Sequence, residues 1–184
     1  MTVARETPQV YTAEDLTSPE VPEKFVELVE GELIHLTPAD WRHNRVASRM
    51  ERLFEAYCLL HDHLEYAGDN DGFVIKRGPD SVLSPDAALF RKPAYSTRPW
   101  RDFSPEIVVE VLSPSTTTWQ LTSKRQRYFK AGTQQFWLVD IEKRQIQFHC
   151  PDGRIVTVSG EETYEADGFA AGLIINLREL FRGV

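Results

Sequence analysis

The sequence has few cysteines, no long apolar segment and no excess of positive charge. Its two cysteines, Cys58 and Cys150, lie far apart and lack the C-x-x-C spacing of zinc and redox sites, so we expect two free, buried or half-buried thiols. No apolar stretch follows Met1 and no segment could span a bilayer, which predicts a cytoplasmic protein with no membrane partner. The net charge of −7 argues against a broad basic face for nucleic acid, but is compatible with a local basic strip.

The length and composition are those of an ordinary globular protein. At 184 residues, with 41% hydrophobic and 27% charged residues, the chain is most simply one domain covering residues 1–184. A chain of this size buries roughly 70% of its unfolded surface, so folding requires neither a metal nor a disulfide. We find no internal repeat and no low-complexity tract.

The hydrophobic periodicity predicts strands and helices in mixed order. Two helices are clearest: one over 41–61 capped by Asp40, and one over 118–131 stopped by Gly132. A strand–helix–strand unit at the centre favours an α/β fold, a mixed β-sheet flanked by helices, over an all-β barrel. The predicted strands are 25–29 and 32–36 as an N-terminal β-hairpin, 64–68, 73–76, 86–90, 107–112, the hairpin 136–140 with 145–149, 154–158, and a short strand before a terminal helix within 173–181.

Glu110 interrupts an otherwise apolar strand. Its neighbours from Ile107 to Leu112 are all aliphatic, and the run is opened by Pro105 and closed by Ser113. Such a run is typical of a strand that is covered on both faces, where an unpaired carboxylate costs several kcal/mol. Glu110 therefore requires a partner, which could be a metal ion or a lysine.

Asp86 and Lys124 are the candidate partners of Glu110. Asp86 begins a strand, and its separation of 24 positions from Glu110 allows the two strands to lie side by side, with carboxylates suited to Mg²⁺ or Mn²⁺. The ordinary alternative is that Pro85-Asp86 is a turn. Lys124 shares a helix face with Gln120 and Tyr128, four residues away on either side. If Tyr128 packs inward, Lys124 points the same way and can hold a water or neutralise a phosphate; otherwise it is a solvated helix lysine.

These motifs together resemble the Uma-two family of restriction-endonuclease-like proteins, within the PD-(D/E)XK nuclease superfamily. The likeness covers about residues 11–176. It rests on Pro85-Asp86, the stretch from Glu110 to Thr116, Lys124, Tyr128, Ala131-Gly132, the stretch from Phe136 to Asp140, the stretch from Glu27 to Leu33, and His43.

The resemblance implies a restriction-endonuclease-like core and a magnesium-dependent endonuclease. It implies that Asp86 and Glu110 bind the metal and that Lys124 is the catalytic lysine, in place of the superfamily's usual lysine two residues after the glutamate, where this chain has Leu112. Many members carry an aspartate four residues before the helical lysine, where this chain has Gln120.

Four further positions are accessory candidates: Glu27, His43, Gln120 and Tyr128. Glu27 and His43 match family positions and could border the site. From the residues alone, Glu27 also fits a sheet edge, and His43 also fits a surface histidine in the first turn of its helix.

A basic cluster on the second helix is the candidate nucleic-acid contact. Lys124, Arg125, Arg127 and Lys130 could hold phosphates beside the site, although cations near a helix C-terminus are also favourable with its dipole. The predicted function is a Mg²⁺- or Mn²⁺-dependent DNA endonuclease. The alternative is a catalytically weakened nuclease fold that acts as a nucleic-acid-binding or assembly module. RNA is disfavoured because the sequence shows no base-stacking platform within a basic groove.

A homodimer is expected, because cutting both strands of a duplex is easiest for a two-fold pair. The candidate contact segments are an exposed Trp100 and the hairpin 136–149.

Overall fold

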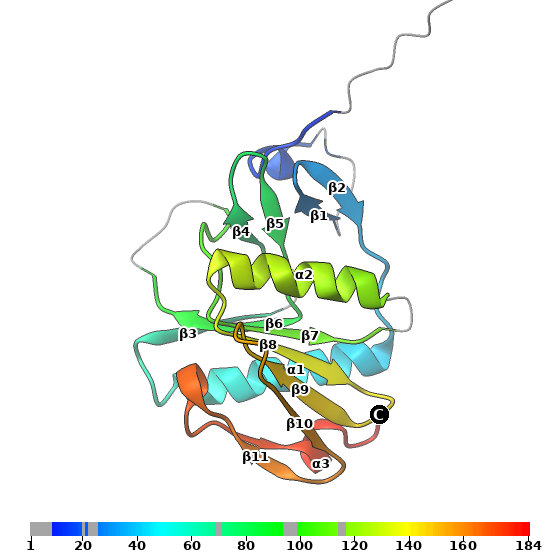
Figure 1. The fold of residues 1–184 in the computed structure, drawn as a ribbon, viewed down its shortest axis with the longest axis vertical. Coiled ribbons are helices and arrows are strands. Elements are labelled where there is room, and N and C mark those ends of the chain that lie inside the picture. Colours follow the sequence, from blue (N-terminus) through cyan, green and yellow to red (C-terminus); the bar gives the residue numbers. More distant parts are fainter. Residues whose placement is uncertain (1–8, 20, 22–25, 69–70, 94–98, 114–116) are drawn as a thin grey trace, which may run out of the picture.

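The computed structural model describes residues 9–19, 21, 26–68, 71–93, 99–113 and 117–184, and these form a mixed α/β fold (Figure 1). The predicted fold class, a mixed sheet flanked by helices, is confirmed. In chain order the elements are η1 (Asp15–Thr17), β1 (Val26–Val29), β2 (Glu32–His35), α1 (Trp41–Cys58), β3 (Leu64–Gly68), β4 (Phe73–Lys76), β5 (Ser81–Leu83), β6 (Ala87–Arg91), β7 (Ile107–Val111), α2 (Thr118–Ala131), β8 (Gln135–Asp140), β9 (Gln145–His149), β10 (Ile155–Ser159), β11 (Thr163–Glu165), η2 (Gly168–Ala170), β12 (Ile174–Asn176) and α3 (Leu177–Leu180).

A six-stranded sheet in the order β10-β9-β8-β7-β6-β3 forms the centre of the fold. The β7–β8 pair is parallel and is connected through α2, whereas the other neighbours are antiparallel. Because side chains alternate across a strand, β7 sends Ile107 and Val109 to one face and Val108 and Glu110 to the other. The sheet is therefore covered by α1 on the first face and by α2 on the second (Figure 1).

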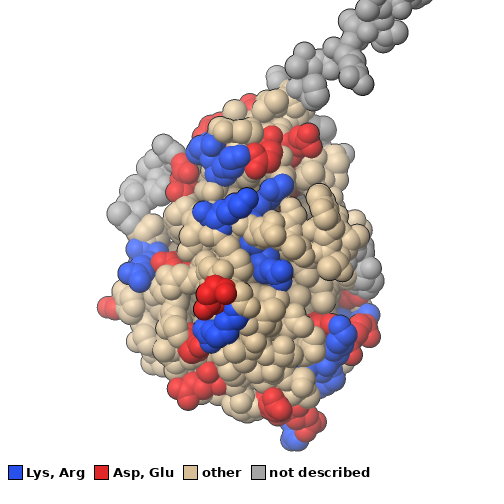
Figure 2. All heavy atoms as spheres, viewed as in Figure 1, with Lys and Arg blue, Asp and Glu red and all other residues tan. Residues whose placement is uncertain are grey.

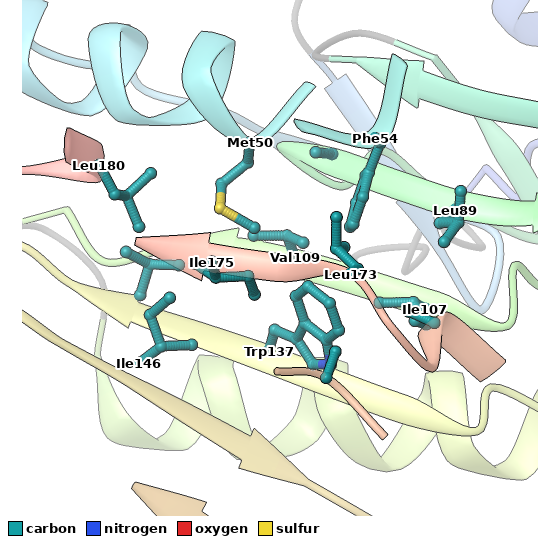
Figure 3. Packing of buried hydrophobic residues seen from close by; sticks show 14 of the residues in the cluster. Met50, Phe54, Leu89, Ile107, Val109, Trp137, Ile146, Leu173, Ile175 and Leu180 are labelled. Atoms are coloured by element: carbon teal, nitrogen blue, oxygen red, sulfur yellow. The ribbon is translucent and has the colours of Figure 1, made fainter. Parts of the chain in front are cut away.

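Helix α1 forms because its apolar residues recur every three or four positions and Asp40 caps its start. The Asp40 carboxylate accepts hydrogen bonds from the backbone N–H groups of Arg42 and His43, as predicted. Met50 and Phe54 pack on the sheet, with the Phe54 ring centroid 5.5 Å from that of Trp137 (Figure 3). The helix ends at Cys58, three residues before the predicted end at 61.

Helix α2 is bounded as predicted, from Thr118 to Ala131. A capping box between Thr117 and Gln120 begins it, and Gly132 at φ 109° ends it in the left-handed conformation that glycine adopts without strain. Tyr128 is fully buried and packs with Phe136, which confirms that this face of α2 points inward.

A second sheet, in the order β2-β1-β5-β4, packs near the outer side of α2. The predicted hairpin forms around Glu30 and Gly31, although residue 25 lies outside the described residues. Leu28 faces one core cluster, whereas Val29 faces α2. The predicted strands 64–68 and 73–76 are confirmed, but they join different sheets as β3 and β4.

Two strands and the exposure of one residue differ from prediction. Strand β5 lies in a segment that its Gly and Pro residues suggested was all turn, and the short β11 pairs with β12 at the C-terminal end. Trp100 is not exposed: its indole Nε1 donates to the carbonyl of Ala13 at 2.8 Å, and its ring packs on a core cluster. The strands of the hairpin 136–149 are largely buried in the sheet, whereas its turn residues Glu142 and Lys143 are exposed and remain the candidate dimer contact.

Cys58 and Cys150 are both free thiols, as predicted. Cys58 is half-buried and Cys150 is buried. Among the helices that the structure describes, none combines the length and apolar character needed to cross a membrane.

Candidate active site

The ammonium group of Lys124 is surrounded by acceptors from three other elements. Its Nζ lies 2.7 Å from Oε1 of Glu110, 2.8 Å from Oε1 of Glu27 and 3.2 Å from the backbone carbonyl oxygen of Ser84. The side chains of Glu27, Glu110 and Lys124 are 7%, 12% and 18% exposed. The contact to Ser84 is a hydrogen bond, and the two carboxylate contacts are ion pairs.

The local structure explains how these groups meet. Glu110 is on the face of β7 that points to α2, and Lys124 is one helical turn before the buried Tyr128. Glu27 is on the face of β1 that also carries Val29, which packs in the α2 cluster. The backbone N–H of Ser84, just after β5, donates to Oε1 of Glu27 at 2.9 Å. The small sheet therefore delivers both a carboxylate and a carbonyl to the lysine.

Asp86 is fixed beside Glu110 across the β6–β7 pair. Its Oδ2 accepts a hydrogen bond from the backbone N–H of Val111 at 2.6 Å and lies 3.3 Å from Nε2 of His43. The two strands are adjacent, as the spacing of Asp86 and Glu110 predicts. His43 comes from the first turn of α1, which begins at the side of the sheet where β7 ends (Figure 1). The structure therefore places Asp86, Glu110, Lys124, Glu27 and His43 together.

Burial and neighbouring charges set the ionisation of this group. Burial raises the pKa of Glu110 to about 8, against the opposing effect of Lys124 and with a further increase from Asp86 and Glu27. Burial lowers the pKa of Lys124, but Glu110 and Glu27 outweigh it and hold the pKa well above its usual value. Lys124 is therefore a cation at neutral pH and cannot accept a proton there.

The pKa of His43 is also displaced. Burial lowers it, but the hydrogen bond and charge of Asp86 outweigh burial, so the net direction is upward. Its Nδ1 is buried, and within the described part of the chain it has no hydrogen-bond partner. The contact between Nε2 and Asp86 holds the imidazole at the site.

The donor set suits a hard divalent cation that retains water. Asp86 and Glu110 offer carboxylate oxygens at adjoining strand positions, and the ion pair with Lys124 is to Oε1 of Glu110. Mg²⁺ and Mn²⁺ bind through one or two protein carboxylates plus waters. Within the described residues, no group of three or more His, Cys, Asp and Glu side chains is arranged to hold a metal, which is the arrangement a structural zinc site requires.

Gln120 and Tyr128 have structural contacts that explain their positions. The Gln120 side-chain oxygen accepts hydrogen bonds from the backbone N–H and the hydroxyl of Thr117, so it is occupied in capping α2. The Tyr128 hydroxyl is buried behind Lys124, without a hydrogen-bond partner in the described part of the chain. Burial raises the pKa of Tyr128 well above its usual value, so this phenol stays neutral.

The four basic residues of α2 do not form one patch. Lys124 is enclosed by carboxylates, and Arg125 points to the other side of the helix, where its Nη1 lies 3.0 Å from Nδ1 of His149. Arg127 is 3.9 Å from Glu30 and lines, with Lys130, a small cavity against β4 and β5. Figure 2 shows basic side chains over α2 and along its border with β4 and β5.

An open cleft of about 1400 Å³ gives access to the site. It is larger than the pockets of small ligands, which measure about 300–1,000 Å³, and so can admit a segment of polymer. Trp119, on the first turn of α2, lines this cleft with 76% of its surface exposed. The sequence analysis missed Trp119, although a tryptophan beside the helix N-cap was an available signal. It also missed the backbone carbonyl of Ser84, because a backbone contact leaves no signal in the sequence. The cleft is lined by Glu27, His43, Asp86, Glu110, Lys124, Gln120 and Arg127, among others.

Comparisons with known proteins give one family match and one similar solved structure. The model of the Uma-two family (Uma2), described as "Putative restriction endonuclease", matches residues 12–178. The chain is also similar to a solved structure from Anabaena variabilis, described as "a putative nuclease belonging to DUF820". That similarity has a TM-score of 0.75 and 19% identity, over 89% of this chain and 94% of the other. At this identity the likeness shows the fold. A search of curated proteins gives no match.

Proposed function

This chain belongs to the Uma-two family, and we propose that it is a metal-dependent endonuclease that hydrolyses the phosphodiester bonds of DNA. The observation that carries the proposal is the buried Lys124 between Glu110 and Glu27, with Asp86 beside them, at an open cleft. Buried charges are costly unless they are paired, and an active site is where such a cost is commonly retained.

The cofactor we propose is Mg²⁺ or Mn²⁺ at Asp86 and Glu110. When bound, such an ion supplies Lewis-acid stabilisation of the charge that develops on the phosphate. Val111 and His43 hold the Asp86 carboxylate in place, through the backbone N–H at 2.6 Å and Nε2 at 3.3 Å. Their role is to orient the carboxylate before substrate arrives, which avoids reorganisation during the reaction.

Lys124 acts as a cation and hydrogen-bond donor. Its raised pKa excludes a role as a neutral base near pH 7. We propose that it donates to a phosphate oxygen or orients the attacking water. The contact to Ser84, the longest of its three at 3.2 Å, is the one most readily exchanged for such a ligand. Glu27 then keeps the ammonium positioned while Glu110 binds metal.

Plasmid cleavage tests the proposal. Purified protein with supercoiled plasmid and Mg²⁺ or Mn²⁺ should produce nicked and linear DNA, and a chelator should abolish both. Asp86→Ala should lose activity, whereas Arg154→Gln, which changes an exposed ion pair with Asp167, should retain it. Absence of cleavage by the wild-type protein with either metal would count against the proposal.

The competing function is a weakened nuclease fold that binds nucleic acid without cutting it. One feature favours it: the resemblance implies an aspartate at this helix position in many members, whereas this chain has Gln120, whose oxygen is occupied by Thr117. In the plasmid experiment this function predicts DNA binding without metal-dependent cleavage.

A further inference from the structure

Four residues form a stripe along the outer face of α1: Trp41, Arg45, Arg49 and Arg52. Their spacings of four, four and three place them on one side of a helix. The guanidinium of Arg45 lies over the Trp41 ring, 4.9 Å from its centroid, which extends the stripe to the first residue of the helix. Arg182, after α3, lies near Arg49 and enlarges the group.

Two arginines of this stripe, Arg45 and Arg49, are held by backbone carbonyls and not by carboxylates. Nη1 of Arg45 donates to the carbonyl of Gly183 at 3.2 Å, and Nη1 of Arg49 donates to that of Leu180 at 2.7 Å. Within the described chain, no carboxylate forms an ion pair with Arg45, Arg49 or Arg52. These contacts fix the side chains without neutralising their charge.

Like charges are therefore concentrated at this surface. Burial lowers the pKa of Arg49, the neighbouring Arg45, Arg182 and Arg52 lower it further, and Glu179 opposes them. Glu179 is itself paired with Arg182 at 2.8 Å. On a chain with a net charge of −7, an uncompensated positive group of this size indicates an anionic partner.

The stripe begins where the cleft ends. His43 and Asn44, in the first turn of α1, line the cleft, and Arg45 follows them directly. Figure 1 shows that α1 and α2 both begin at the side of the sheet where β7 ends. From Trp41 to Arg52 the helix rises about 16 Å, close to the length of five base-pair steps at about 3.4 Å each.

We propose that this arginine stripe, Arg45, Arg49 and Arg52 with Arg182, holds the phosphate backbone of duplex DNA on the flank of the cleft. This inference rests on the proposed function for its substrate, and it places the phosphate contacts that flank the cleft on α1 instead of α2. On α2, Lys124 and Arg127 face carboxylates and Arg125 faces His149. Among the described residues, Arg45, Arg49 and Arg52 have no carboxylate ion-pair partner, whereas Arg182 is paired with Glu179. Arginine is well suited to phosphate because its planar fork forms paired hydrogen bonds.

The test is the salt dependence of DNA binding in the presence of chelator, so that no cleavage occurs. A labelled duplex of about 20 base pairs is titrated by fluorescence anisotropy over roughly 0.05–0.2 M salt. The key variant is Arg52→Gln, because Arg52 is exposed and anchors no other segment. The double variant, Arg45→Gln with Arg52→Gln, removes a second charge from the stripe. Thermal melting verifies that each variant is folded. Arg154→Gln is the control for an equal change in net charge outside the stripe.

Each arginine removed from the stripe should lower the slope of log K against log salt by about 1 and weaken binding on the order of fivefold to tenfold at 0.1 M salt. Arg154→Gln should leave both unchanged. Wild-type affinity and slope in Arg52→Gln, or equal weakening in Arg154→Gln, would overturn the inference. If the stripe variants weaken DNA binding but the wild-type protein does not cut plasmid with metal, the proposed function is refuted and the stripe is not. If the wild-type protein cuts plasmid but the stripe variants bind DNA as well as wild type does, the stripe is refuted and the proposed function is not.

Discussion

Replacement of Lys124 by methionine should destabilise the protein, and by an amount that depends on pH. The substitution keeps the packing stem and removes the charge that lies 2.7 Å and 2.8 Å from two buried carboxylates. Loss of one partner from a buried ion pair costs about 3–5 kcal/mol, because the remaining charge is uncompensated. Here Glu110 and Glu27 are left facing one another. We expect a loss of about 3–5 kcal/mol in the free energy of unfolding at high pH.

The pH dependence follows from the pKa of Glu110. Burial, Asp86 and Glu27 raise this pKa, and Lys124 is the cation that opposes them. Without Lys124 the folded-state pKa rises further above the unfolded value, so the folded variant binds a proton more tightly than the unfolded chain. Stability is then lost as pH rises through the folded pKa and regained as pH falls. The penalty of Lys124→Met should therefore be largest near pH 9 and smaller near pH 5.

Urea unfolding of wild type and Lys124→Met at the two pH values is the measurement. Adding Glu110→Gln to Lys124→Met should recover part of the loss, because one uncompensated carboxylate is removed. Lys76→Met is the matched control: Lys76 pairs with Glu30 at the surface, with both side chains at least 40% exposed, and its loss should cost less than about 1 kcal/mol. Equal stability of Lys124→Met and wild type at pH 9 would refute the account of a buried charged cluster.

Three further outcomes are expected. Titration calorimetry should show Mn²⁺ or Mg²⁺ binding to wild type and its loss in Asp86→Ala; equal binding by both proteins would exclude the site. Burial and Arg125 lower the pKa of His149 to about 4. As pH falls below about 6.5, the unfolded chain therefore binds a proton at this residue before the folded protein does. The free energy of unfolding should fall by about 3 kcal/mol by pH 4. His149→Gln should flatten that dependence, and an unchanged pH profile would contradict it. Light scattering at micromolar concentration should give a homodimer, and a mass near 21.1 kDa would contradict this.

Local signals in the sequence determined most of the elements. Asp40 and Gly132 mark helix ends through their own backbone and side-chain chemistry, and both act as predicted. The aliphatic run around Glu110 specifies a strand covered on both faces, and the inward Tyr128 orients Lys124 on α2. These features depend on neighbours within a few residues, so a single sequence contains enough information to predict them.

The composition of the site was decided by tertiary structure. Whether Glu27 pointed inward or lay at an edge depended on how β1 pairs with β5, a short strand hidden among turn residues. The carbonyl of Ser84 completes the contacts of Lys124, and a backbone atom is the same in every residue type.

Charge distribution was also a property of the folded chain. Consecutive residues on a helix differ by about 100° in direction, so Lys124 and Arg125 diverge although they are adjacent in sequence. Conversely, Arg49 and Arg182 are distant in the chain and lie near each other because α3 packs against α1. Sequence determines which charges are present, whereas the long-range packing of helices and strands determines which of them meet a partner and which face the solvent.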